Sequence, residues 1–255
     1  MSLTPPHIED LCKAVTAFGD TKRELCIGYL VDDVNRKHGI YPLDVSSGSD
    51  QQQWIACSLR QVLTRHANVA RPLRHHDKLR IAVNLASSVL QLYRTPWLDE
   101  HWSDKDVYFI HRPGVPLSAL YDHPFVYRKL STPCTTQSVG PQRAAGKVIR
   151  NQTLFTLGIL LIELLYDKPI EELRIPRDQD YEGTPGVVWC TVDRLVKEEI
   201  EHEAYPPYVA AVRRCIWCDF NRKESSLDDE AFQQAVFEGV VTPLEQLLQQ
   251  FLRGD

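Results

Sequence analysis

Residues 154–166 read LFTLGILLIELLY, and this run decides the fold. It is apolar on nearly every side of a helix, and Glu163 is the one acidic residue within it. A helix of this kind is buried all round. The run is too short to cross a bilayer, which needs about 20 apolar residues. It therefore predicts a buried helix at the centre of a helical layer, and no membrane span.

Apolar residues at helical spacing predict further helices on both sides of this run. One of these covers 79–93, with Asp77 as its cap. Cap signals at Ser226 and at Thr242, the latter followed by proline and Glu245, predict the start of the last two helices. The remaining helices are predicted over 8–18, 58–64, 187–203, 208–218, 226–237 and 244–252.

Alternating apolar residues predict strands over 24–31 and 37–43, joined as a hairpin, and a short strand over 107–110. Residues 70–76 are interpreted as a basic connector. The stretch 112–151 is rich in Pro, Ser and Thr and predicts a long loop. The order of elements indicates an α+β fold with a small N-terminal part and a mostly helical body.

The composition is that of a folded globular protein. Of the residues, 43% are hydrophobic and 25% are charged. The length of 255 residues is enough for one large domain or two small ones. The net charge of -5 argues against a broad nucleic-acid-binding surface, which needs a basic stripe. With no signal peptide in view, the seven cysteines are expected to be free thiols in a cytoplasmic protein.

The order of elements also resembles a protein kinase that lacks its beginning. Residues 155–164 resemble the kinase segment Trp-Ser-Leu-Gly-Val-Ile-Leu-Tyr-Glu-Leu, and Asp167-Lys168-Pro169 follows where kinases have Gly-Lys-x-Pro. The segment 57–63 resembles the stretch after the kinase hinge, and 79–93 the long helix before the catalytic loop. Cys215, Ile216, Asp219 and Arg222 resemble a later Cys-Leu-x-x-Asp-x-x-x-Arg stretch.

A closer resemblance is to a fungal family of degenerate kinase-like domains, often found with HeLo-type or prion-inhibition domains of heterokaryon incompatibility. It runs from about Ile8 to about Leu248. The residues that carry it are Ala86-Ser87-Ser88-Val89-Leu90-Gln91-Leu92, Thr95-Pro96-Trp97-Leu98, Trp102 with Asp106-Val107-Tyr108-Phe109, Arg150-Asn151, 154–164 and 168–173.

The resemblance implies a protein-kinase-like fold. It implies a truncated N-lobe over 1–56, with one helix and a short hairpin, and a helical C-lobe over 57–255. Both parts are expected to form one compact unit.

Kinase chemistry needs parts that this sequence lacks. No glycine spacing fits a phosphate-covering loop, and no lysine precedes the first helix. The stretch 101–107 offers Asp104 or Asp106 as a weak candidate for the catalytic base, but no Asn follows at the required spacing. No Asp-Phe-Gly follows Ile110, and Thr153 replaces the aspartate that begins the buried helix. A surface or turn-capping role is the preferred interpretation of both aspartates.

Cys215 and Cys218 form a C-x-x-C pair and are weak candidates for metal ligands. A zinc site needs two more ligands, and Cys190 and His202 are the nearest. The preferred interpretation is a helix that buries its thiols.

A basic run, Arg71, Arg74, His75, His76, Lys78 and Arg80, is a candidate surface for an acidic partner or lipid headgroups. The alternative, preferred on general grounds, is a solvated linker and helix start.

The sequence supports three hypotheses. The first is a catalytically inactive kinase-like interaction or regulatory module, binding unknown protein partners without cofactor, metal or ATP. The resemblance implies a role in fungal self/non-self recognition or cell death. The second is an unconventional phosphotransferase or nucleotide-binding switch, with Asp104 or Asp106 gathered near Lys105 or Arg112. The third is a fragment whose missing N-terminal part supplies the absent strands.

Overall fold

The computed structural model describes residues 6–18, 26–31, 36–40, 55–65, 71–95, 97–98, 102–111, 115–127, 149–179 and 186–253. These residues fall into two compact units, divided between Trp54 and Ile55. Each unit is described by itself. The boundary at residue 56 and the single compact unit remain predictions.

The smaller unit contains a helix and a hairpin. Helix α1 (Leu11–Phe18) begins three residues later than predicted because Asp10 accepts a hydrogen bond from the Lys13 amide at 3.0 Å. Strands β1 (Gly28–Val31) and β2 (Lys37–Ile40) pair antiparallel, with Gly28 opposite Ile40. The predicted hairpin is confirmed, with shorter strands.

The larger unit contains a three-stranded antiparallel sheet. Its strands β3 (Ile55–Ser58), β4 (Val107–His111) and β5 (Phe125–Val126) lie in the order β3-β4-β5. Strand β4 confirms the prediction for 107–110. The other two strands were not predicted, and β5 lies inside the stretch expected to be loop.

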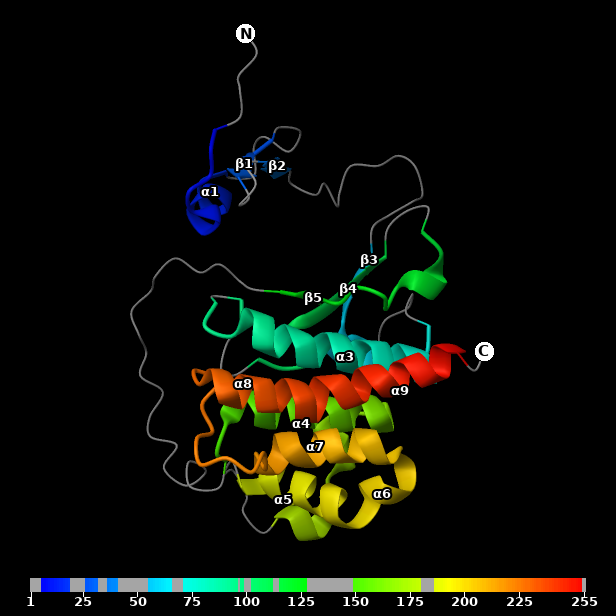
Figure 1. Ribbon diagram of the computed structural model, residues 1–255. Coiled ribbons are helices and arrows are strands. Elements are labelled where there is room, and N and C mark those ends of the chain that lie inside the picture. Colours follow the sequence, from blue (N-terminus) through cyan, green and yellow to red (C-terminus); the bar gives the residue numbers. More distant parts are fainter. Residues whose placement is uncertain are drawn as a thin grey trace. The chain divides into compact units, whose positions relative to one another are not determined.

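Helix α4 (Gln152–Tyr166) lies at the centre of the larger unit (Figure 1). Asn151 caps its start by accepting a hydrogen bond from the Leu154 amide at 2.9 Å. Asp167 ends it in the left-handed conformation. The prediction that 154–166 is buried nearly all round is confirmed, since most of its side chains are buried on every face.

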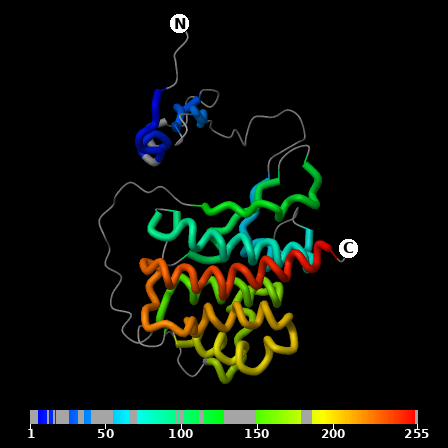
Figure 2. Tube along the Cα trace, viewed as in Figure 1, coloured from blue at the N-terminus to red at the C-terminus, as the bar shows by residue number. Residues whose placement is uncertain are grey.

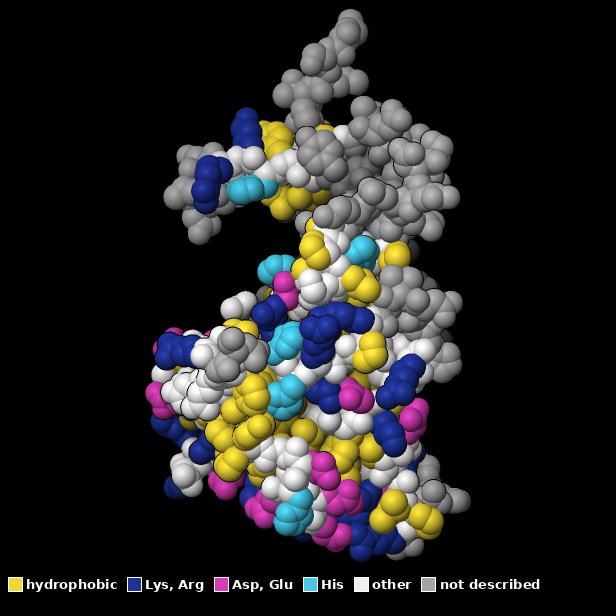
Figure 3. Space-filling view, turned by 90° about the vertical axis from the view of Figure 1, so that its right-hand side faces the viewer, with side chains coloured by type: hydrophobic (Ala, Val, Ile, Leu, Met, Phe, Trp, Pro, Cys, Tyr) yellow, Lys and Arg dark blue, Asp and Glu magenta, His cyan; other side chains and the backbone are white. Residues whose placement is uncertain are grey.

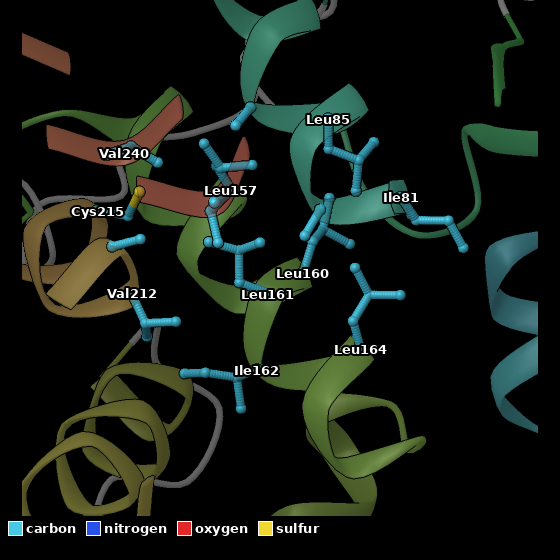
Figure 4. Packing of buried hydrophobic residues seen from close by; sticks show 14 of the residues in the cluster. Ile81, Leu85, Leu157, Leu160, Leu161, Ile162, Leu164, Val212, Cys215 and Val240 are labelled. Carbon is cyan, nitrogen blue, oxygen red and sulfur yellow. The ribbon is translucent and has the colours of Figure 1, made fainter. Parts of the chain in front are cut away.

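Two helices cover α4, and a third packs against them. Helices α3 (His75–Leu92) and α7 (Pro206–Trp217) pack directly against it, and α9 (Thr242–Arg253) runs alongside α3 (Figure 2). Apolar side chains of α4, α3, α7 and the turn before α9 meet in one core (Figure 4). The labelled members are Ile81, Leu85, Leu157, Leu160, Leu161, Ile162, Leu164, Val212, Cys215 and Val240.

Helices α4 and α7 approach each other closely at Gly158. A Cβ atom built at Gly158 would lie 2.5 Å from Cδ1 of Ile216 and 3.1 Å from Cβ of Cys215. The first distance is shorter than carbon atoms adopt, so any side chain at this position would require Ile216 to shift.

Helix α3 begins earlier than predicted. Its first residue is His75, so the end of the predicted connector 70–76 is helical. Asp77 does cap the start, but from the third helical position, where its carboxylate accepts the Arg74 amide at 2.8 Å. The cap was identified correctly, but the helix boundary was wrong.

Two further long helices each contain a π-helical turn. The first is built of α5 (Gly186–Arg194), the π-turn η5 (Leu195–Glu199) and α6 (Ile200–Glu203), which confirms a helix over 187–203. The second is built of α8 (Glu230–Val236), the π-turn η6 (Phe237–Val241) and α9.

Two predicted helix starts in this region are wrong. Helix α8 is capped by Asp229, which accepts the Phe232 amide at 2.7 Å, and not by Ser226. Thr242 is no cap at all, because α9 continues from η6 without a break.

Short turns complete the larger unit. One is the short α-helix α2 (Leu59–Leu63), which Ser58 caps. The others are the 3-10 turns η1 (Leu117–Ala119), η3 (Ile170–Leu173) and η4 (Pro176–Gln179). The predicted loop 112–151 is thus wrong where η1 and β5 form, and 128–148 lies outside the described residues. The fold is α+β and mostly helical, and none of its described helices combines the length and the apolar character needed to span a bilayer.

Candidate functional site

Asp104 lies at the centre of a polar cluster in the larger unit. Its residue is only 1% exposed, and its Oδ2 atom lies 2.5 Å from Nε of Arg60. The amide of Arg60 also donates to the Asp104 carbonyl at 3.0 Å. The turn before β4 and the start of α2 are thereby joined. The expected surface or turn-capping position of Asp104 is wrong, because the carboxylate is buried in an ion pair.

Glu171 holds the other end of the same guanidinium. The two terminal nitrogens of Arg60 donate to its two carboxylate oxygens at 2.8 and 3.2 Å. This two-pronged geometry is the strongest form of Arg–carboxylate pairing. Arg60 is therefore shared between a buried carboxylate and an exposed one.

Glu163 adds a third carboxyl group, from the buried helix α4. Its Oε1 accepts the Ile170 amide at 2.8 Å, while its Oε2 has no hydrogen-bond partner among the described residues. Burial, reinforced by the charge of Asp104, raises the pKa of Glu163 to about 8. Glu163 is accordingly protonated at neutral pH, which avoids a second buried negative charge.

Asp106 has the role expected for it. Its carboxylate accepts hydrogen bonds from the amide and the hydroxyl of Ser103, at 2.9 and 3.0 Å, and so caps the turn before β4. Lys105 is exposed, and Arg112 lies outside the described residues. The structure therefore pairs the carboxylate of Asp104 with Arg60, while the carboxylate of Asp106 binds Ser103 within the same turn.

The basic run is largely engaged within the chain. Arg71 binds Asp77 and the carbonyls of Leu117 and Ser118, and Arg80 pairs with Asp122. Lys78 donates to the Leu165 carbonyl at 3.1 Å and lies 2.7 Å from Asp167. The interpretation as a solvated linker is wrong for these three cations.

The other members of the run lie nearer solvent. Arg74 is exposed, and His76 has its Nε2 3.2 Å from Asp77. The ring of His75 contacts the rings of Tyr205 and Phe251, with centroids 5.7 and 4.6 Å apart. Whether the run meets an acidic partner stays a prediction.

Cys215 and Cys218 lie at the end of α7, and both are buried free thiols. Burial raises the pKa of each thiol. Cys190 is half-buried, and His202 is exposed. No group of three or more His, Cys, Asp or Glu side chains suited to a metal ion occurs within the described part of the chain. The packing of both thiols agrees with the preferred interpretation.

Sequence reasoning missed Arg60, Glu163 and Glu171 as parts of one cluster. A single charge inside the apolar run 154–166 was the available signal, since a buried carboxyl must find a partner or a proton. It also missed the buried pair of Arg194 and Asp178, joined by hydrogen bonds of 2.9 to 3.2 Å. No local pattern marks that pair.

Comparison with models of known families identifies the family of the chain. A family model described as "Domain of unknown function (DUF7580)" matches residues 2–251. The chain belongs to this family. The match covers nearly the whole sequence, so the cluster around Asp104 and the helical core both lie within the family's domain. No curated protein matches the chain.

Proposed function

We propose that this DUF7580 chain is a catalytically inactive, protein-kinase-like interaction module. The observation that carries the proposal is the burial and ion pairing of Asp104. By the kinase resemblance, Asp104 is at the position of the catalytic base. A base must reach its substrate's proton, and a metal ligand must reach its ion. Asp104 is buried and paired with Arg60, so it does neither.

The hydrophobic framework supports the same proposal. The element order of the larger unit and the buried helix α4 agree with a kinase C-lobe that keeps its core without its chemistry. Domains of this kind act through their surfaces. By resemblance, we propose a role in fungal self/non-self recognition or cell-death signalling, in the cytoplasm.

The proposal is tested by calorimetric titration of the purified full chain with Mg²⁺-ATP. The expected result is no heat of binding at millimolar nucleotide. A titration with ATP and excess chelator is the matched control for metal dependence. Micromolar, metal-dependent binding would contradict the proposal.

A second candidate is an unconventional phosphotransferase or nucleotide-binding switch that uses a rearranged cleft. It is favoured by one observation: three carboxyl groups, of Asp104, Glu163 and Glu171, gather around one guanidinium. Under this candidate, Glu171→Gln abolishes the metal-dependent binding seen in the same titration. Under the leading proposal, neither protein binds.

A further inference from the structure

A hollow of about 220 Å³ opens on the larger unit between the start of α3, the end of α4, the junction of α6 with α7, and α9. The residues that line it include His75, Leu79, Leu165, Ala204, Tyr205 and Leu247. A cavity of about 150 Å³ is large enough for a benzene ring. The hollow therefore has room for one large apolar or aromatic side chain.

Two polar groups in its wall, those of Lys78 and Tyr208, are already hydrogen-bonded within the chain. Lys78 donates to the Leu165 carbonyl and pairs with Asp167, and the buried Tyr208 hydroxyl donates to the Leu161 carbonyl at 2.7 Å. A guest gains little from hydrogen bonds with these groups. The interior consequently favours an apolar anchor.

Three aromatic rings pack together at the edge of the hollow. His75, Tyr205 and Phe251 contact one another in pairs, with centroids 4.6 to 5.7 Å apart. Tyr205 is nevertheless 49% exposed, and the neighbouring Leu252 is 50% exposed. Burial and the nearby charge of Lys78 lower the pKa of His75, so its ring is neutral at physiological pH. Exposed aromatic side chains held in place are typical of binding hot spots.

Exposed residues of both charges, Arg74 and Glu203, occur next to these rings. Arg74 precedes His75 at the start of α3, and Glu203 lines the hollow from the end of α6. Both are exposed, and neither forms an ion pair with another described residue. Figure 3 shows hydrophobic side chains on this face of the larger unit, with several basic side chains above them and several acidic ones below.

We propose that this face docks a protein segment with one large apolar anchor, flanked by an acidic residue on one side and a basic residue on the other. The anchor enters the hollow, the acidic flank meets Arg74, and the basic flank meets Glu203. Charge complementarity at the rim sets the choice and orientation of partner more than the raw affinity. This inference rests on the proposed function, since it names the partner of an interaction module.

The test is selection of a random displayed peptide library on the full chain. The enriched peptides are expected to share a Phe, Leu, Ile or Trp between an acidic and a basic residue. One enriched peptide is then synthesised and its affinity measured. Ala204→Phe, which fills the hollow from its edge, is expected to weaken binding about tenfold or more. Ala231→Phe, an equivalent change at an exposed position of α8, leaves it unchanged.

Charge reversal gives a second, independent readout. The Glu203→Lys variant is expected to bind the enriched peptide more weakly than the wild type does. It is expected to bind more tightly a version of the peptide in which glutamate replaces the basic flanking residue. The proposal is overturned if no peptide is enriched, if the enriched peptides lack the pattern, or if Ala204→Phe binds them as the wild type does. A dimer of the chain that Ala204→Phe dissociates would also overturn it, because a second copy would then be the occupant. Mg²⁺-ATP binding would refute the proposed function without affecting these peptide results, so the two failures are distinguishable.

Discussion

The protonation of Glu163 makes the folding stability of the chain depend on pH. In the folded chain its pKa is about 8, against an ordinary value of 4.5. Between these values the folded chain holds a proton that the unfolded chain has lost, so stability falls as pH rises through this window. The slope reaches at most about 1.4 kcal/mol per pH unit.

Glu163→Gln removes this dependence and keeps an acceptor for the Ile170 amide. Urea unfolding between about pH 5 and about pH 8 measures the effect. The wild type is expected to lose stability with rising pH relative to the variant. Glu172→Gln, which changes an exposed carboxyl on η3, the turn that contains Ile170, is expected to follow the wild type. Parallel profiles for wild type and Glu163→Gln would contradict the raised pKa.

The residue scale is also where prediction from sequence was weakest. The sequence marked Asp104 as a candidate, but its carboxylate pairs with Arg60, which also binds Glu171, 111 positions from Arg60. Such pairings follow from the packing of distant elements, and no local pattern encodes them. Asp106 was interpreted correctly because its partner, Ser103, is three positions away.

At the scale of elements, the contact between α4 and α7 depends on one glycine. Alanine is intrinsically better than glycine inside a helix by about 1 kcal/mol. Gly158→Ala is nevertheless expected to lower the unfolding free energy by about 1–3 kcal/mol, because its methyl group would collide with Ile216.

Chemical denaturation of Gly158→Ala measures the loss. Ile216→Val removes the atom that comes closest, so in the double variant the penalty of Gly158→Ala is expected to shrink. Additive effects of the two changes, or a stabilised Gly158→Ala, would show that the helices do not meet as closely as described.

Adjacent arginines of α7 reach the two π-turns. Arg214 donates to the Gly239 carbonyl in η6 at 2.8 Å, while Arg213 reaches the Val196 carbonyl in η5 at only 3.5 Å and otherwise pairs with the exposed Glu201 at 2.6 Å. A good hydrogen bond from a charged donor is worth about 1.5–3 kcal/mol, and one at 3.5 Å far less.

Replacing each arginine by methionine compares the two contacts in one helix. Arg214→Met is expected to destabilise the chain by about 1.5–3 kcal/mol, and Arg213→Met by clearly less. Thermal unfolding monitored by circular dichroism gives the comparison. Equal losses of stability in the two variants would mean that the hydrogen bond to the Gly239 carbonyl does not stabilise the chain more than the contacts of Arg213 do.

Elements with strong apolar periodicity were predicted well. The helices α3, α4 and α7 were located to within a few residues because their buried stripes repeat over several turns. The strand β3 was missed because four residues, Ile-Ala-Cys-Ser, carry no alternating pattern. Helix starts at Ser226 and Thr242 were wrong because a cap-like residue also fits a turn, or a helix that is already under way.

At the scale of the whole molecule, the α+β class and the largely helical body followed from the order and spacing of the apolar segments. The kinase likeness and the interaction role remain proposals that rest on resemblance and on the engagement of Asp104. Both proposals assume that the Asp104–Arg60 pair stabilises the larger unit and does not bind a ligand.

The measurement that tests this premise most directly is the unfolding free energy of wild type and Asp104→Asn, each with and without Mg²⁺-ATP. A ligand that binds the folded state stabilises it in proportion to its concentration and affinity. The account predicts that Asp104→Asn loses about 2–3 kcal/mol because Arg60 is left without its buried partner, and that nucleotide changes neither protein. A wild type stabilised by Mg²⁺-ATP, together with an Asp104→Asn variant that is equally stable but no longer responds, would contradict it.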